Sequence, residues 1–257
     1  LPIQYLMWLK RAVVGDFGVS IATGRPVAGA LVRAVPNTLM LAVGASLLGF
    51  ILGAIFGGIA GYYQGTWVDK FATGIAITGI SVPHYWLGIV LVIVFSVEMG
   101  TLPAMGMGPG GSSAWAWDIA HMRHLVLPVI TLSVIPMGII TRTTRAAVSE
   151  ILNQEFVQTL HSKGLWHRQV LMHVIKNAAP TVLAVMGLQL GYLLGGSILV
   201  ETVFSWPGTG FLLNDAIFRR DIPLLQGTIL VLALFFVFLN LMVDICQTMI
   251  DPQMRRG

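Results

Sequence analysis

The sequence is poor in charged residues. Asp, Glu, Lys and Arg together make up 10% of the 257 residues, whereas hydrophobic residues make up 56%. Soluble domains typically carry about 25% charged residues. This shortage excludes an ordinary soluble domain and predicts an integral membrane protein. The formal net charge is +4, and it is spread over the segments between apolar runs. We therefore expect no nucleic-acid partner.

Cysteine and secretion signals are also scarce. Cys246 is the only cysteine and lies in an apolar run, so no intrachain disulfide is expected and no redox compartment is indicated. The chain starts at Leu1 without a basic stretch followed by a short apolar core. We therefore predict no signal peptide at its start.

Long apolar runs make up most of the sequence. A membrane-spanning helix needs about 20 predominantly apolar residues. The runs predict an all-α integral membrane protein whose spans are residues 37–63, 71–97, 124–141, 181–203 and 224–250. Residues 1–36 are mixed in composition, with turn signals in GDFG and TGRP, and predict a segment outside the membrane. The transmembrane domain is expected at residues 37–257.

Two of these runs carry glycine at every fourth position. The first set is Gly49, Gly53, Gly57 and Gly61, and the second is Gly187, Gly191 and Gly195. On a helix, such residues form one smooth stripe that lets a second helix approach closely. We expect packing inside a helix bundle, and a pore-lining stripe is the alternative.

A few polar residues fall within the apolar runs. His84 follows Pro83, which is expected to kink the second span, and Gln189 lies within the second glycine stripe. Polar groups at membrane depth usually face a cavity or a partner helix. His84, Gln189, Gly191 and Gly195 are therefore candidates for a translocation pathway, with helix packing as the alternative. Asn240 and Asp244 could form an ion site or simply pair with neighbouring helices.

The longest charged segment, residues 142–180, lies between two predicted spans and is expected to be a water-exposed loop. Apolar residues in it recur at helical spacing, with Phe156, Val157 and Leu160 on one face. Asn153 is expected to cap this short helix and Gly164 to end it. A polar loop that holds amphipathic helices predicts a docking element, and a solvated linker is the alternative.

Motifs for catalysis and cofactor binding are not found in the sequence. His161, His167 and His173 are six residues apart and do not share a helix face, so we expect no metal site. The pattern GxxxxGK[ST] is missing, so ATP cannot bind by that route. We expect no catalytic residues and no enzymatic activity in this chain.

Three segments carry a distinctive pattern. Residues 154–165 read QEFVQTLHSKGL, residues 187–210 read GLQLGYLLGGSILVETVFSWPGTG, and residues 240–255 are similar to the pattern NLxVDxxxxxxDPRxR. These segments resemble the permease subunits of ATP-binding-cassette importers, in particular the dipeptide/oligopeptide branch. The charged segment departs from the branch at Gln158, Leu160 and His161, which would make its docking helix bulkier and less charged.

The resemblance implies six spans in a complete family member, so we expect the first span to be missing from this chain. It also implies that residues 142–180 are cytoplasmic, that residues 1–36 are extracytoplasmic, and that the bacterial inner membrane is the location. Contact with the ATPase would fall on the residues that follow Gln154 in the loop. They are Glu155, Gln158, Thr159, Leu160, Lys163 and Gly164.

The implied function is the translocation of peptides or similar small solutes, driven by ATP and Mg²⁺ on partner subunits, with no cofactor bound by this chain. The implied partners are a second permease subunit, two ATP-binding subunits, an external solute-binding protein and membrane lipid. Nickel, opines or glutathione are alternative solutes. An ion-gradient-driven transporter, which would depend on Asp244, and a structural or receptor membrane protein are the rival classes.

Overall fold

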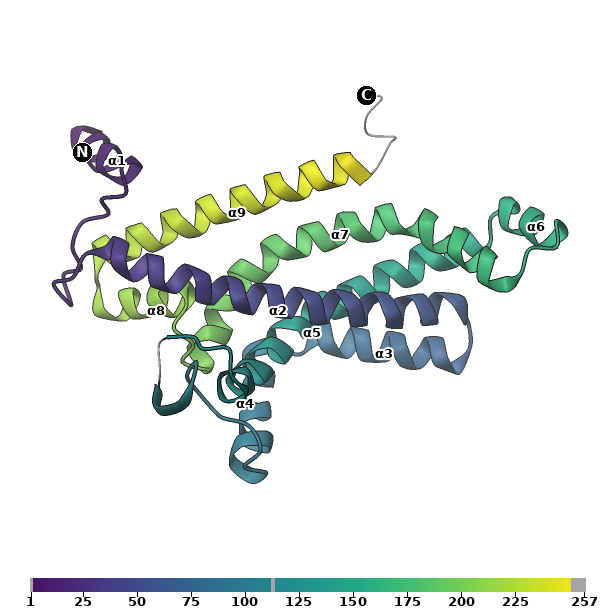
Figure 1. Ribbon diagram of the computed structural model, residues 1–257, viewed down its shortest axis with the longest axis horizontal. Helices are drawn as coiled ribbons and strands as arrows, with labels where there is room; N and C mark the ends of the chain where they lie inside the picture. The colour runs from purple at the N-terminus through teal and green to yellow at the C-terminus, as the bar shows by residue number, and fades with distance from the viewer. Residues whose placement is uncertain (1, 112–113, 251–257) are drawn as a thin grey trace. The chain divides into compact units, whose positions relative to one another are not determined.

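The computed structural model describes residues 2–111 and 114–250, and it is built from helices (Figure 1). Within these residues, the isolated bridge between Val19 and Pro26 is the one extended pairing. The all-α class expected from the apolar runs is therefore confirmed. Among the residues with expected roles, the side chain of Asp244 and everything after Ile250 lie outside the described part of the chain.

The helices follow one another in a simple order. They are α1 (Pro2–Val13), α2 (Val27–Tyr62), α3 (Trp67–Ser81), α4 (His84–Leu91), α5 (Ile119–Leu152), α6 (Glu155–Ser162), α7 (His167–Val203), α8 (Thr209–Arg219) and α9 (Ile222–Ile250). A π-helical segment, Val92–Glu98, continues α4, and a short 3₁₀ turn occupies Pro109–Gly111.

Among the residues that the structure describes, four helices, α2, α5, α7 and α9, contain stretches long and apolar enough to cross a membrane. A fifth span results if α3 and α4 with its π-helical extension count as one, but these two parts are bent by 100°. Pro83 lies at the break, where its missing N–H cannot continue the helix. The kink at Pro83 is thus confirmed, and the predicted span over residues 71–97 is either one sharply broken span or a re-entrant pair of helices.

The expected loop at residues 142–180 is largely helical. α5 continues to Leu152, and α7 begins at His167, so only short connections flank α6. Pro180 accordingly lies well inside α7 and not in the first turn of a span. The charged residues of this segment led to wrong predicted helix ends, because a helix that leaves the membrane can carry polar residues without ending. Helix α8 was not expected at all.

The chain divides into two compact units. Unit 1 comprises residues 1–44, 85–132 and 194–238, and unit 2 comprises residues 45–84, 133–193 and 239–257. In the described part of the chain, four long helices, α2, α5, α7 and α9, each contribute one part to either unit. We describe the two units separately.

Buried polar contacts fix the connection between α7 and α8 in unit 1. The fully buried indole of Trp206 donates from Nε1 to the carbonyl oxygen of Asn37, at 3.0 Å. The Glu201 carboxylate accepts hydrogen bonds from the amides of Gly210 (2.7 Å) and Phe211 (3.1 Å) in the first turn of α8. A carboxylate at this position satisfies amides that have no partner inside the helix. Thr38 accepts a further bond from the amide of Thr209, at 2.8 Å.

Asp221 fixes the start of α9 in the same unit. Its carboxylate accepts from the Ser20 hydroxyl and from the amides of Ile21 (3.2 Å), Ala22 (3.3 Å) and Leu224 (3.2 Å). Burial raises the pKa of Asp221, but these hydrogen bonds outweigh burial, so the pKa lies below its usual value. Asp221 thereby joins the turn that precedes α2 to the start of α9.

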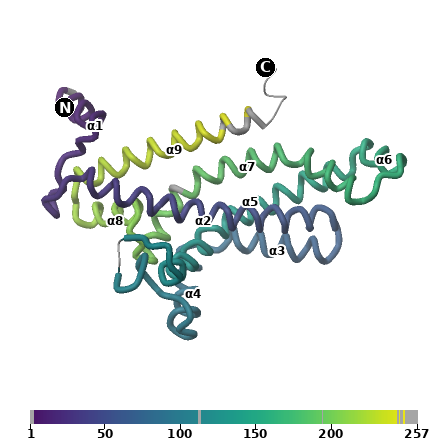
Figure 2. Tube along the Cα trace, in the orientation of Figure 1, coloured from purple at the N-terminus to yellow at the C-terminus, as the bar shows by residue number. Residues whose placement is uncertain are grey.

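Close helix packing organises unit 2, where α2 and α3 lie next to each other in the chain trace (Figure 2). The glycines of the first stripe all face α5. A Cβ on Gly57 would lie 2.5 Å from the carbonyl oxygen of Thr141, and one on Gly53 would lie 2.8 Å from that of Met137. The stripe is therefore a helix-packing surface, as expected. The second stripe differs, because a Cβ on Gly195, which belongs to unit 1, would meet nothing within 4 Å.

Candidate functional site

Short turns connect α6 to the end of α5 and to the start of α7 in unit 2 (Figure 2). The helix begins after the extended residue Gln154 and ends at Gly164, whose φ is +76°. Glycine adopts this left-handed conformation without a steric penalty, so Gly164 ends the helix as expected. The expected Asn153 cap is wrong, because the Asn153 amide donates to the carbonyl oxygen of Ser149, at 2.8 Å.

The inner face of α6 is anchored to both neighbouring helices. Val157 is 3% exposed and packs in one apolar cluster with Ile151 of α5 and Val174 of α7. Phe156 and Leu160 are half-buried against the same cluster. Leu160, expected on a docking surface, thus packs partly against this cluster. A push on α6 would reach α5 and α7 through this cluster, since packed interiors transmit strain.

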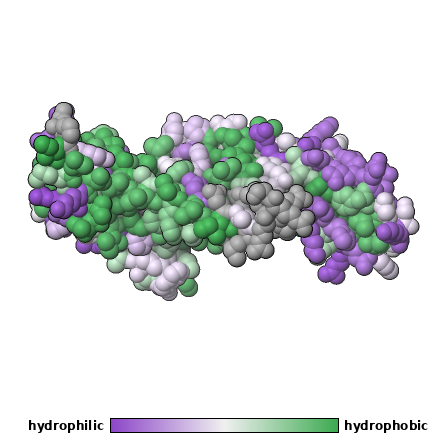
Figure 3. All heavy atoms as spheres, turned by 90° about the horizontal axis from the view of Figure 1, so that it is seen from above, coloured by the Kyte–Doolittle hydropathy of each residue, from purple (hydrophilic) through white to green (hydrophobic). Residues whose placement is uncertain are grey.

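The outer face of α6 is polar. Glu155, Gln158, Thr159 and Lys163 are exposed, and Gly164 lies beside them. The space-filling view shows hydrophilic residues gathered around α6 (Figure 3). Among the described residues, the side-chain charged and amide groups of Glu155, Gln158 and Lys163 have no hydrogen bond or ion pair. This face therefore offers hydrogen-bonding and charged groups to an external surface.

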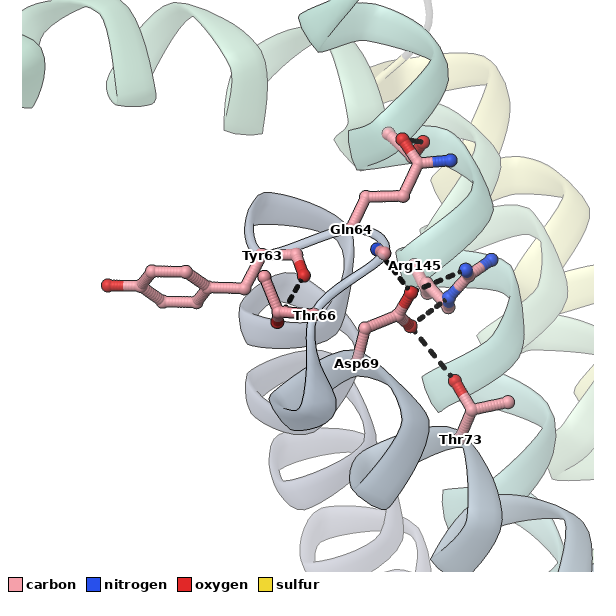
Figure 4. Close-up of polar contacts among 8 residues, drawn as sticks. Tyr63, Gln64, Thr66, Asp69, Thr73 and Arg145 are labelled. Atoms are coloured by element: carbon pink, nitrogen blue, oxygen red, sulfur yellow. Dashed lines mark hydrogen bonds and ion pairs between the residues drawn. The ribbon is translucent and has the colours of Figure 1, made fainter.

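An ion pair fastens the turn between α2 and α3 to α5 (Figure 4). Asp69, 4% exposed, accepts from Arg145 through Nε at 2.5 Å and Nη2 at 2.8 Å. The amide of Gly65 (2.9 Å) and the hydroxyl of Thr73 (3.2 Å) complete its hydrogen bonds. Such a bidentate arrangement fixes orientation as well as charge. Sequence reasoning missed this pair, although Asp69 is an isolated acidic residue at the start of an apolar helix.

A cavity of about 800 Å³ lies beside this ion pair in unit 2. Residues from α3, α5 and α7 line it, and the polar residues among them are Thr73, Arg142, Thr143, Arg145, Glu150, Gln154, Asn177 and Thr181. A cavity with these groups could hold a polar or charged solute. No sequence pattern predicts this cavity, because its walls come from three helices far apart in the chain.

The pathway candidates lie on α4 and α7 and not on α6. His84 begins α4, and its Nε2 is buried with no hydrogen-bond partner among the described residues. The Oε1 of Gln189 on α7 is buried in the same way. Gly191 is buried, whereas Gly195 is exposed. The two unpaired polar atoms mark places where a further group could bind.

The described part of the chain offers no metal-binding cluster. No group of three or more His, Cys, Asp or Glu side chains there could hold a metal ion. The rings of His161 and His167 do meet, at 5.6 Å between centroids, next to the end of α6. Two exposed imidazoles are short of the ligand set that a metal site needs.

The chain matches known transport proteins over nearly its whole length. Residues 49–256 match the family described as binding-protein-dependent transport system inner membrane component. The glutathione transport system permease protein GsiC of Escherichia coli K12 is 38% identical over 99% of this chain and 80% of its own length. The dipeptide transport system permease protein DppB of Alkalihalophilus pseudofirmus is 36% identical over 98% of this chain and 81% of its own length.

Solved structures show the same fold. A chain of the MetNI methionine ABC transporter in an inward-facing conformation superimposes with a TM-score of 0.69 at 16% identity. The match covers 86% of the present chain and 96% of the transporter chain. An amino acid ABC transporter crystallised with histidines matches with a TM-score of 0.61 at 13% identity, over 86% of this chain and 92% of its own.

The chain belongs to the family of binding-protein-dependent transport system inner membrane components. It is an inner-membrane permease component of an ABC importer of the peptide type, with a multi-pass helical fold. Membership implies ATPase and binding-protein partners.

Proposed function

We propose that α6 couples ATP hydrolysis on partner subunits to movement of the membrane helices. The observation that carries the proposal is the two-sided character of α6. Its outer residues Glu155, Gln158, Thr159 and Lys163 are exposed and polar, while Val157 holds the inner face to α5 and α7. The outer face would contact an ATP-binding subunit on the cytoplasmic side, and the apolar cluster would carry the motion inward.

The energy source of this movement lies outside the chain. Two ATP-binding subunits would bind ATP and Mg²⁺, and this chain would bind no cofactor and hydrolyse nothing. Nucleotide binding to the partners must favour one arrangement of the permease over another, because a ligand shifts an equilibrium only by its differential affinity. A bistable helix bundle linked to α6 meets that requirement.

The solute is proposed to be a peptide or a similar small molecule delivered by an external binding protein. Relatives named for glutathione and dipeptide transport support this class, and nickel or an opine is the alternative. A second, different permease subunit would complete the pathway. His84, Gln189, Gly191 and Gly195 are its candidate lining or packing residues, and the buried unpaired atoms of His84 and Gln189 support that role.

Reconstitution of the complete importer into vesicles tests this function. Uptake of a labelled dipeptide, tripeptide or glutathione would be measured with ATP and Mg²⁺ inside or outside the vesicles, and with an imposed ion gradient alone. Uptake should require nucleotide on the α6 side and the binding protein on the other. Gradient-driven uptake without the ATP-binding subunits would instead show a secondary transporter.

A further inference from the structure

We propose that the cavity beside the Asp69–Arg145 pair holds a short peptide-like solute by its two charged ends. Arg142 would bind the carboxylate, and Glu150 would bind the ammonium group. This inference rests on the proposed function and adds to it a site on the cytoplasmic side of the pathway, with the residues that recognise the solute.

The first argument is the state of the charges around the cavity. Arg145 is neutralised by Asp69, which accepts two hydrogen bonds from its guanidinium group. Arg142 and Glu150 line the same cavity and are exposed. In the described part of the chain, neither side chain has an ion pair or a hydrogen bond. The α5 wall of the cavity therefore presents the unpaired guanidinium group of Arg142 and the unpaired carboxylate of Glu150 to a bound solute. The charge of Arg145 is already neutralised by Asp69.

The second argument is the distance between these charges. Arg142 and Glu150 are eight residues apart on α5, which corresponds to about 12 Å along a helix at 1.5 Å per residue. An extended peptide spans about 3.3–3.6 Å per residue, so three residues cover about 10 Å. With the reach of both side chains, the pair suits peptides of roughly two to four residues. Arginine is suited to the carboxylate because its planar guanidinium can donate two parallel hydrogen bonds.

The third argument is the remaining lining. Thr73, Thr143 and Asn177 contribute uncharged polar groups from three different helices. These groups can hydrogen-bond to peptide amides, which every peptide possesses, and they make no demand on peptide side chains. The site would therefore recognise length and free ends more than sequence.

The position of the cavity fits the exit side of a pathway. Its lining extends along α5 from Ile139, within a predicted span, to Ile151, and it includes Gln154, which directly precedes α6. Ile139 and Ile151 are twelve positions apart, or about 18 Å along a helix. A solute bound between Arg142 and Glu150 would lie between membrane depth and the coupling helix.

Uptake of end-blocked peptides by the complete importer tests the site. The variants are Arg142→Gln and Glu150→Gln, with Lys70→Gln and Glu98→Gln as charge-matched controls on exposed residues outside the cavity. A tripeptide with free ends would be compared with its C-terminal amide and its N-acetyl form. All variants receive solute from the same binding protein, so any preference of that protein cancels in the ratio to the unsubstituted importer.

Arg142→Gln should lower uptake of the free tripeptide about tenfold, as loss of one charge-assisted contact implies, and lower that of the amide much less. Glu150→Gln should show the mirror pattern, with the N-acetyl form least affected. The inference is overturned if both variants behave like the controls, or if either lowers uptake of all three peptides equally. Absence of ATP-driven peptide uptake by the unsubstituted importer would overturn the proposed function itself.

Discussion

The α7–α8 connection of unit 1 and the α6 end of unit 2 place their polar residues in opposite environments. In the α7–α8 connection, Glu201, Trp206 and Thr38 are buried, and each forms a hydrogen bond with a neighbouring backbone group. Around α6, polar side chains such as Glu155 and Lys163 are exposed and have no partner among the described residues.

The α7–α8 connection is suited to holding the local fold, whereas the outer face of α6 is suited to contact with a partner. A buried polar network held by several hydrogen bonds favours one local conformation and is costly to disturb. An exposed polar face on an apolar anchor can meet a partner without first breaking internal bonds. Substitutions in the first region should therefore affect stability, and those on the outer face of α6 should affect coupling.

The largest loss of stability is expected from Glu201→Ala. The substitution leaves the buried amides of Gly210 and Phe211 without their acceptor, which should lower the free energy of unfolding by about 3 kcal/mol. Glu201→Gln keeps an acceptor oxygen and should lose less than half as much. Thermal or denaturant unfolding in detergent measures both. Equal losses would show that the amide contacts do not hold α8.

A smaller loss is expected where unit 2 depends on close helix packing. Gly57→Ala places a methyl group against the backbone of α5 and should cost about 2 kcal/mol, because the backbone cannot move aside cheaply. The adjacent Gly58→Ala is the matched control, since its Cβ would meet nothing within 4 Å. If the two variants unfold alike, α2 and α5 do not approach as closely as described.

The two faces of α6 should respond differently. Val157→Ala removes buried apolar surface and should cost about 1.5 kcal/mol of stability, at about 0.8 kcal/mol per lost carbon group. Thr159→Ala on the outer face should change stability by less than about 0.5 kcal/mol but lower solute-stimulated ATP hydrolysis. Unfolding and ATPase assays on both variants sharpen the comparison. The proposed difference between the two faces is refuted if Thr159→Ala is less stable than Val157→Ala.

A smaller loss of stability than that of Val157→Ala concerns pH and Asp221. Its pKa is lower in the folded protein than the unfolded value of about 3.9. The carboxylate therefore contributes stability above that value, and the contribution is lost as the pH falls through the lower folded pKa. Asp221→Asn should cost about 1 kcal/mol at neutral pH and make stability less sensitive to acid. Identical pH profiles for the two proteins would refute this role.

The sequence was sufficient for the fold class because apolar length and glycine spacing depend only on local pattern. The stripe at Gly53 and Gly57 packs as its four-residue period predicts, and Gly164 ends α6 because only its backbone freedom suits that turn. Pro83 likewise marks the break between α3 and α4.

Long-range contacts were beyond the same reasoning. Asp69 and Arg145 are 76 residues apart, and each looks unremarkable in its own segment. Leu160 was expected on a docking surface, because helical spacing alone does not say which neighbour covers a face. The ends of α5 and α7 were misplaced because charged residues were taken to end a helix, whereas both helices continue beyond the apolar run.

Crosslinking from α6 to the ATP-binding subunit tests the central claim most directly. Cysteine would replace Thr159 on the outer face or Val157 on the inner face, in a Cys246→Ser background within the complete importer. A crosslink should form from position 159, change in yield when ATP binds, and be missing from position 157. Absence of any crosslink from position 159 and from the neighbouring outer position Ser162 would contradict the assignment of α6 as the coupling helix.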